Sequence, residues 1–519
     1  MREFPLVITK ALTQGLRPKK EISLPNEFLK ECYNMKPSVA GLQRYDGATD
    51  PFSTGVNTSW PWPQLFLTQD YRLLAQETEV SMVGSGTLPW GLTSLDLKDP
   101  KNPATSVNVP TSGGPWQFVS FGESWFLSKE NATVFKLGYD RITGDSPEYF
   151  LDTSTTINAI SSHRGRILIG GFDEANFWST AWTDVFTTWQ NNVADGNTSY
   201  QFDDVGENWI AWSSIGEADF PAWLFFPDNV SSSLGVTEHN ILQRVRRNEL
   251  GWMQMPFQGK VLSIEPLGNG VVVYGTDGIA ILSLTGVSNV DGIGDPTAST
   301  YGVVFSYNVG LHSRNAVAVS QERHVFLSSD GQLFTLNAEF ALERLDYQEY
   351  LGNMLSEEVN AFYEPYTEEY HFCSSAEGFA FAPQGLYEHK DRFTTLNTEH
   401  GTTYGLSHSP ATTDIQVQTV PIDVRIQSKK RINNVQVSAP GVEELKTNIH
   451  TRYSYTEPWQ DTGFSTNNKE GVNHRRVNGL EFMVELQGSA TTGAAVNQIT
   501  LRYQLPDKRA IRGPFPDVS

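Results

Sequence analysis

The chain has 519 residues, of which 39% are hydrophobic and 12% aromatic, so it can bury a large core in two or three domains. Its 59 Asp and Glu against 38 Lys and Arg leave a net charge of −21, and its two cysteines, Cys32 and Cys373, are too few for a disulfide framework. The cysteine count favours folding in a reducing compartment, and the acidic balance argues against strong nucleic-acid binding by the central residues 61–420.

The sequence shows no membrane anchor and no secretory signal. No apolar run approaches the roughly 18 residues of a membrane span. The opening residues Met1-Arg2-Glu3-Phe4-Pro5-Leu6 lack the charged and apolar regions of a signal peptide. We therefore expect synthesis in a cytoplasm.

The first 60 residues are expected to form an extended N-terminal arm that joins the C-terminal platform domain. Residues 24–47 hold many apolar side chains but no regular helical or strand period. Such a segment suits an arm that wraps over another part of the fold or over a neighbouring subunit. The stretch Trp60-Pro61-Trp62-Pro63 then predicts a rigid start to the next domain.

Residues 61–420 repeat one small unit: an apolar strand, a tight polar turn, a second strand, another turn and usually a third strand. The clearest copy covers residues 261–282, and Gly and Asn in its turns supply the positive φ angles of tight hairpins. Copies begin near residues 118, 158, 209, 261, 316 and 359, and the weakest of them joins Trp209–Trp212 to residues 223–226.

A strand meander that recurs at this interval is typical of a β-propeller, whose blades need about 40–50 residues each. Six blades fit the six copies, and residues 65–75 are suited to begin a seventh. We therefore predict an all-β protein with a propeller of six to seven blades. The alternative is an irregular array of β-sandwiches.

Residues 421–519 are expected to form a C-terminal β platform domain, with strands at 422–426, 432–437, 450–455, 480–486 and 499–505. The chain then ends in a basic cluster that includes Lys508, Arg509 and Arg512. Such a cluster is either a solvated face or part of a binding surface.

The charge is distributed unevenly among the three predicted parts. Residues 1–60 hold eight Lys and Arg against six Asp and Glu, and residues 421–519 hold thirteen against ten. The central residues 61–420 hold 17 against 43. This acidic centre serves either solubility or a surface past which DNA moves without adhering.

The sequence offers no recognisable catalytic or metal-binding motif. It contains no His-Glu-x-x-His, no His-x-His, no phosphate loop and no complete nucleophile elbow. Ser329-Asp330-Gly331 is only a partial match to the Asp-box turns of sialidase propellers. We predict no enzyme activity, no cofactor and no metal.

The arm, the repeated units and the tail together resemble the nozzle or tail-hub proteins of short-tailed bacteriophages, including the tubular tail protein B type and the packaged-DNA stabilisation hub. The resemblance is carried by Asn34-Met35-Lys36-Pro37 and Gly41-Leu42 in the arm, by residues 261–284, and by residues 477–482 and 507–513 in the tail. The chain has no room for the long tip insertions of the largest relatives.

The resemblance implies a structural homohexamer that forms a tube below the portal and adaptor ring, retains packaged double-stranded DNA and conducts it during ejection without binding it specifically. Its partners would be the head–tail adaptor and tail fibre or needle proteins, and it would be made in the host cytoplasm and reside in the virion tail. The expected assembly contacts are Pro37, Leu42, Arg44, Lys508, Arg509 and Arg512.

The rival function is that of an isolated propeller that binds or cleaves glycans, such as a receptor-binding lectin or a sialidase. A protein-interaction propeller of the kind with Trp-Asp repeats is not matched, because the sequence has no such repeat.

Overall fold

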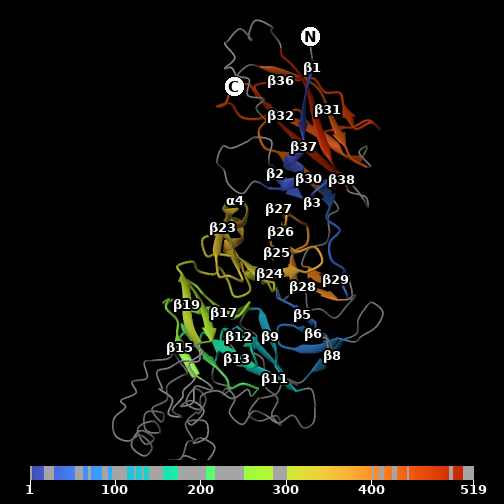
Figure 1. The fold of residues 1–519 in the computed structure, drawn as a ribbon. Coiled ribbons are helices and arrows are strands. Elements are labelled where there is room, and N and C mark those ends of the chain that lie inside the picture. Colours follow the sequence, from blue (N-terminus) through green and yellow to red (C-terminus); the bar gives the residue numbers. More distant parts are fainter. Residues whose placement is uncertain are drawn as a thin grey trace, which may run out of the picture.

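The computed structural model shows an elongated molecule with a propeller at one end and a smaller β domain at the other (Figure 1). The structure describes residues 3–16, 28–52, 62–67, 72–83, 92–95, 114–121, 124–130, 134–138, 156–172, 206–216, 251–284, 301–399, 402–407, 414–422, 429–440, 444–489 and 495–505. The short helices of this part are α1 (Lys10–Gln14), α4 (Gln348–Leu351) and the 3-10 helix η3 (Gly352–Ser356). No helix in these ranges is long and apolar enough to cross a membrane.

The propeller consists of antiparallel meanders in which each strand pairs with the next one along the chain. In the described ranges these are β5 (Gln64–Leu67), β6 (Arg72–Ala75), β7 (Val80–Val83) and β8 (Leu92–Leu95); β9 (Trp116–Phe121), β10 (Ser124–Lys129) and β11 (Val134–Gly138); β12 (Ala159–His163), β13 (Arg166–Gly170), β14 (Trp209–Trp212) and β15 (Gly251–Gln254); β16 (Val261–Leu267), β17 (Gly270–Gly275), β18 (Ile279–Leu284) and β19 (Tyr301–Tyr307); β20 (Val317–Val319), β21 (Arg323–Leu327), β22 (Leu333–Asn337) and β23 (Leu342–Asp346); and β24 (Asn360–Glu364), β25 (Glu369–Cys373), β26 (Gly378–Ala382) and β27 (Gly385–Glu388). The predicted all-β fold and the predicted propeller are confirmed.

The second strand of a meander is buried on both faces because the neighbouring meanders pack against it. Every residue of β13, β17 and β25 is buried. A strand covered on both sides favours apolar side chains at consecutive positions, as at residues 167–169 of β13 and 271–273 of β17, whereas β25 also buries Glu369 and His371. Separate apolar clusters join β6 to β10, β10 to β12 and β13 to β17.

The hairpin β28 (Phe393–Glu399) and β29 (Thr402–Ser407) lies between the last meander and the first. The hydroxyl of Thr395 donates a hydrogen bond of 3.0 Å to the carbonyl of Leu65 in β5, and Leu406 shares an apolar cluster with Leu65. Thr49 forms a parallel bridge with Tyr404 on the other side of the hairpin. The N-terminal segment therefore helps to close the propeller.

The strands of the second domain come from both ends of the chain. We call this unit, which comprises β1–β4 and β30–β39, the terminal domain. One sheet contains β1 (Glu3–Ile8), β31 (Lys430–Ser438), β35 (Val472–Asn473), β36 (Val477–Gly479) and β39 (Gln498–Gln504); a second contains β2 (Leu29–Tyr33), β30 (Asp414–Thr419), β32 (Lys446–Arg452), β33 (Gln460–Asp461), β34 (Ser465–Thr466) and β37 (Glu481–Ser489); a third contains β3 (Met35–Ser38), β4 (Gly41–Arg44) and β38 (Ala495–Val496). Val437 and Ile499 of the first sheet and Val417 and Val484 of the second belong to one hydrophobic core.

The segment expected as an arm without regular structure is largely strand. β1 pairs along its whole length with β39, from Glu3 with Gln504 to Ile8 with Ile499. β2 pairs with β30, and β4 pairs with both β3 and β38. β1, β2 and β4 pair with strands far away in the sequence, so the local sequence carries little signal for these pairings.

The structure corrects the predicted blade order at one place. Trp209–Trp212 does not begin a blade of its own: it is β14, which pairs with β13 and β15 inside the meander that starts at β12. β13 and β14 pair although 38 residues lie between Gly170 and Trp209. This spacing is close to the length of a whole blade, which is why the sequence suggests a new blade at Trp209. Of residues 65–75, expected to begin a seventh blade, 65–67 lie in β5 and 72–75 in β6, the first two strands of the first meander, and 68–71 lie outside the described ranges. Residues 223–226 lie outside the described ranges.

The predicted start of the C-terminal domain at residue 421 is also too late. β30 (Asp414–Thr419) pairs with β37 on one side and with β2 on the other. It is therefore a strand of the terminal domain, whereas the sequence predicts a propeller that extends to residue 420.

Candidate functional site

The axis of the propeller is crossed by a buried arginine. Arg314 lies just before β20 and only 2% of it is exposed. Its Nη1 donates to the carbonyl of Pro115 at 3.0 Å, and its Nη2 donates to Oε1 of Gln117 at 3.2 Å and to Oγ of Ser128 at 3.1 Å. These acceptors belong to the β9–β11 meander, three meanders away around the ring, so the guanidinium ties opposite sides of the propeller together.

Two carboxylates belong to the same electrostatic cluster. Burial lowers the pKa of Arg314 to about 10, while the negative charges of Glu130 and Glu358 oppose that shift. Burial and the charge of Glu130 raise the pKa of Glu358 to about 7, and Arg314 opposes this rise. Glu130 also accepts a hydrogen bond of 3.0 Å from the amide of Gly114.

We call Arg314, Gln117, Glu130 and Glu358 the axial cluster, and its hydrogen bonds connect separate meanders of the propeller as a cross-brace. Gln117 Oε1 accepts a further bond of 3.0 Å from the amide of Ile160, so one side chain connects the β9, β12 and β20 meanders. Both terminal nitrogens of the Arg314 guanidinium are bonded to protein acceptors. They hold the starts of the inner strands in place, while Nε of the same side chain is buried without a hydrogen-bond partner.

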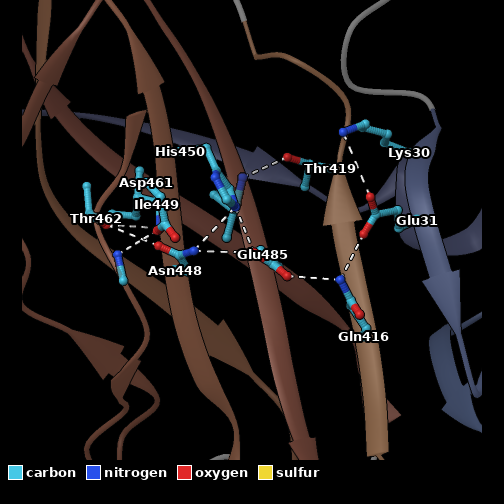
Figure 2. Close-up of polar contacts among 12 residues, drawn as sticks. Lys30, Glu31, Gln416, Thr419, Asn448, Ile449, His450, Asp461, Thr462 and Glu485 are labelled. Atoms are coloured by element: carbon cyan, nitrogen blue, oxygen red, sulfur yellow. Dashed lines mark hydrogen bonds and ion pairs between the residues drawn. The ribbon is translucent and has the colours of Figure 1, made fainter. Parts of the chain in front are cut away.

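A second polar cluster crosses the terminal domain (Figure 2). Nε2 of Gln416 in β30 donates to Glu31 in β2 at 2.9 Å and to Glu485 in β37 at 3.0 Å. The other oxygen of Glu485 lies 2.7 Å from Nε2 of His450 and accepts from Asn448 at 3.3 Å, both in β32. Four adjacent strands are thereby joined by side chains as well as by their ladder.

The outer edge of this row continues to β33. Thr462 donates to the side-chain oxygen of Asn448 at 3.2 Å. The backbone amide of Gly463, followed by the side chain of Asn448, holds the pKa of Asp461 below its usual range. Within the described ranges no group of three or more His, Cys, Asp and Glu is arranged to hold a metal ion. The row is a polar network that fixes the register of the sheet.

The propeller and the terminal domain are joined by one continuous sheet of ten strands. β27 pairs in parallel with β2 at Glu388 and Tyr33, which links β24–β27 to β30, β37, β32 and β33. The side-chain oxygen of Asn34 accepts from the amide of Lys390 at 2.6 Å. Nζ of Lys36 lies 2.5 Å from the nearly buried carboxylate of Glu369. This junction was missed from sequence because single Asn and Lys residues in an arm give no signal of their partners.

The predicted assembly residues of the arm lie in the β3–β4 hairpin. Pro37 and Leu42 are cross-strand partners and both are buried within the chain itself, so their side chains contribute to the core of the terminal domain. Arg44 is partly exposed, with its Nε 3.9 Å from Asp46. Lys508, Arg509 and Arg512 lie outside the described residues. A contact of any of these six residues with another subunit stays a prediction.

The fold defines a β-propeller protein with an appended terminal domain. No protein-family model matches the sequence, and no curated protein matches it. Among solved structures, the chain is 10% identical over 78% of its length to PorZ, a bacterial surface component of the type-IX secretion system of Porphyromonas gingivalis, with a TM-score of 0.34. The chain covers 45% of that structure, less than half its length.

Two further solved structures show similarly low scores. A chain of a mitotic checkpoint complex is 11% identical, with 73% of this chain and 92% of that chain covered and a TM-score of 0.37. A structure of YCF48 bound to a D1 peptide is 9% identical, with coverage of 73% and 97% and a TM-score of 0.34. Likeness at this level carries no argument about function.

Proposed function

We propose that the chain is a structural virion protein, the nozzle or hub of a short bacteriophage tail. Copies of it, six in number by the resemblance, assemble into a ring whose channel retains packaged DNA and conducts it during ejection. The protein carries out no reaction and needs no cofactor. Its partners are the head–tail adaptor and the tail fibre or needle proteins, and it is made in the host cytoplasm before it enters the virion.

The observation that carries this proposal is the continuous sheet between the two domains. A loop-linked pair of domains moves by default, whereas here the Tyr33–Glu388 pair of β2 and β27 and the backbone bonds from Leu16 to Leu386 and from Asn34 to Glu388 couple the propeller to the terminal domain. The Lys36–Glu369 ion pair reinforces the same junction. A wall that must resist the pressure of packaged DNA needs such a rigid subunit.

The axial cluster fills the middle of the propeller, and this affects where DNA would pass. The Arg314 side chain spans the middle of the propeller and is bonded on the far side to Pro115, Gln117 and Ser128. The channel of the proposed ring therefore lies between subunits and does not run through a single propeller. Residues 61–420 hold 43 acidic against 17 basic side chains, and this net negative charge would repel the phosphates of a duplex sliding along them.

The glycan-binding or sialidase alternative is less well supported. A sialidase uses free arginines to hold the carboxylate of its substrate, whereas the terminal nitrogens of Arg314 are bonded to acceptors of the protein. The neighbouring Glu130 and Glu358 add negative charge, which disfavours an anionic sugar at this position.

Electron microscopy of the purified full-length chain, alone and mixed with the adaptor protein of the same virus, tests the proposal. We expect rings with an open centre, and native mass spectrometry should give the mass of a closed oligomer. A chain that stays monomeric in both conditions, or that turns over a sialoside or a polysaccharide, would overturn the proposal.

A further inference from the structure

β19 presents an exposed apolar strip on the outside of the propeller. It is the outermost strand of its meander, and within the described ranges it pairs only with β18. Val303, Val304 and Phe305 are 42%, 49% and 45% exposed. Among the exposed large apolar residues of the described chain, these are the only three that follow one another in sequence.

Three consecutive side chains are exposed because β19 is the outermost strand of its meander. Ile281 pairs with Phe305 while Leu282 pairs with Val303, so Val304 is an extra residue without a partner in β18, at a β-bulge. Val303 and Phe305 are opposite successive residues of β18, so they lie on opposite faces of the strand, and the bulge places Val304 between them. The bulge also interrupts the regular row of backbone groups that another strand would need, so a partner must contact this strip by side-chain packing.

The strip is held in place at both ends by tyrosines. Tyr301 is fully buried, with its hydroxyl 3.1 Å from Nδ1 of His163 and its ring 5.2 Å from that of Trp212. At the other end the hydroxyl of Tyr307 donates to the carbonyl of Phe340 at 2.6 Å. A surface fixed in this way loses little conformational entropy when it is covered.

Charge indicates what covers the strip. β19 contains no charged residue, whereas β23, the outer strand of the next meander, carries Glu343, Arg344 and Asp346. Two copies of a body with 43 acidic and 17 basic residues repel each other over most of their surface. They can approach closely only where charge is absent and apolar area is available.

We propose that Val303, Val304 and Phe305 form a subunit–subunit contact in which this strip of β19 packs against the flank of a second copy of the chain. This inference rests on the proposed ring, and it assigns one of the surfaces that close the ring. A head-to-tail contact of this kind repeats around a closed oligomer and leaves no strip uncovered.

The experiment compares Val304→Lys with Gln254→Lys in the purified full-length chain. Gln254 is an exposed residue on the outer strand β15, so both variants add one positive charge to the outside of a blade. Sedimentation velocity and native mass spectrometry over a concentration series give the association constant. Val304→Lys should weaken association by roughly tenfold or more, as expected for a residue at the centre of a contact, and Gln254→Lys should leave it unchanged.

Phe305→Ser provides a second test, because it removes apolar surface without adding a charge, and it should weaken association in the same direction. If the unmodified chain forms a ring and both β19 variants assemble with the same constant, the β19 contact is wrong and the ring proposal stands. If the unmodified chain is monomeric alone and with the adaptor, the ring proposal itself is wrong.

Discussion

Replacing Arg314 with methionine tests whether the axial cluster braces the propeller. Methionine keeps much of the apolar stem but removes the bonds to Pro115, Gln117 and Ser128. A buried polar group left without a partner costs about 1–3 kcal/mol, and hydrogen bonds to a charged group contribute about 1.5–3 kcal/mol. Gln117 retains its bond from Ile160, so we expect a loss of about 3 kcal/mol.

That loss corresponds to a fall in the melting temperature of roughly 4 °C, taking about 2.1 cal/mol/K per residue over about 350 cooperatively unfolding residues. Differential scanning calorimetry of the full chain measures it. Arg344→Met is the matched control, because the side chain of Arg344 is 53% exposed and its ion pair with Asp346 lies on the surface. Exposed pairs contribute about 0–1 kcal/mol, so this variant should melt within about 1 °C of the unmodified chain.

The cost of Arg314→Met should also depend on pH. The pKa of Glu358 is already raised to about 7, and loss of the guanidinium raises it further. At pH 6 the variant therefore binds a proton on Glu358 and avoids an unpaired charge, whereas at pH 8 the ionised carboxylate remains beside Glu130. The difference from the unmodified chain should be larger at pH 8. Equal melting temperatures for Arg314→Met and Arg344→Met at pH 8 would refute the cross-brace.

Three other substitutions test the junction and the propeller core. Gly385→Ala should lower the free energy of unfolding by more than about 1 kcal/mol, because Gly385 has a φ of +151° and a Cβ there would lie 2.0 Å from the carbonyl oxygen of Gln14. A chemical denaturation curve measures this loss. Lys36→Met leaves the buried carboxylate of Glu369 without its cation and should destabilise the junction by about 3 kcal/mol. This loss should appear as faster proteolysis between the two domains. An unchanged cleavage rate would count against the ion pair. His324 is fully buried, and burial lowers its pKa from the ordinary value of 6.5 to about 4. Between pH 6.5 and pH 4 the folded chain therefore binds fewer protons than the unfolded chain, so it loses stability as the pH falls through this range. His324→Gln should therefore reduce the acid-induced fall in melting temperature by an amount equivalent to up to about 3 kcal/mol, and an identical pH profile would contradict the assignment.

Local sequence determines the repeating strands. Residues 261–284 could be divided correctly into β16, β17 and β18 because each strand is an apolar run and the Gly- and Asn-containing turns lie next to it. The charge division between the centre and the two ends is likewise a property of the sequence alone. These features depend on neighbours a few residues away, so no tertiary information is needed to see them.

Tertiary structure alone decides which distant segments meet. Glu3 pairs with Gln504 in the terminal domain, and Arg314 reaches Gln117 across the propeller. Trp209–Trp212 was misplaced for the same reason, since its partner β13 lies beyond a long connection. A strand at the end of the chain and an arginine before a strand each have many compatible partners in the sequence. Closure of the propeller and of the sheets in the terminal domain selects one partner for each segment. Only that arrangement buries the apolar faces and also satisfies the buried polar groups.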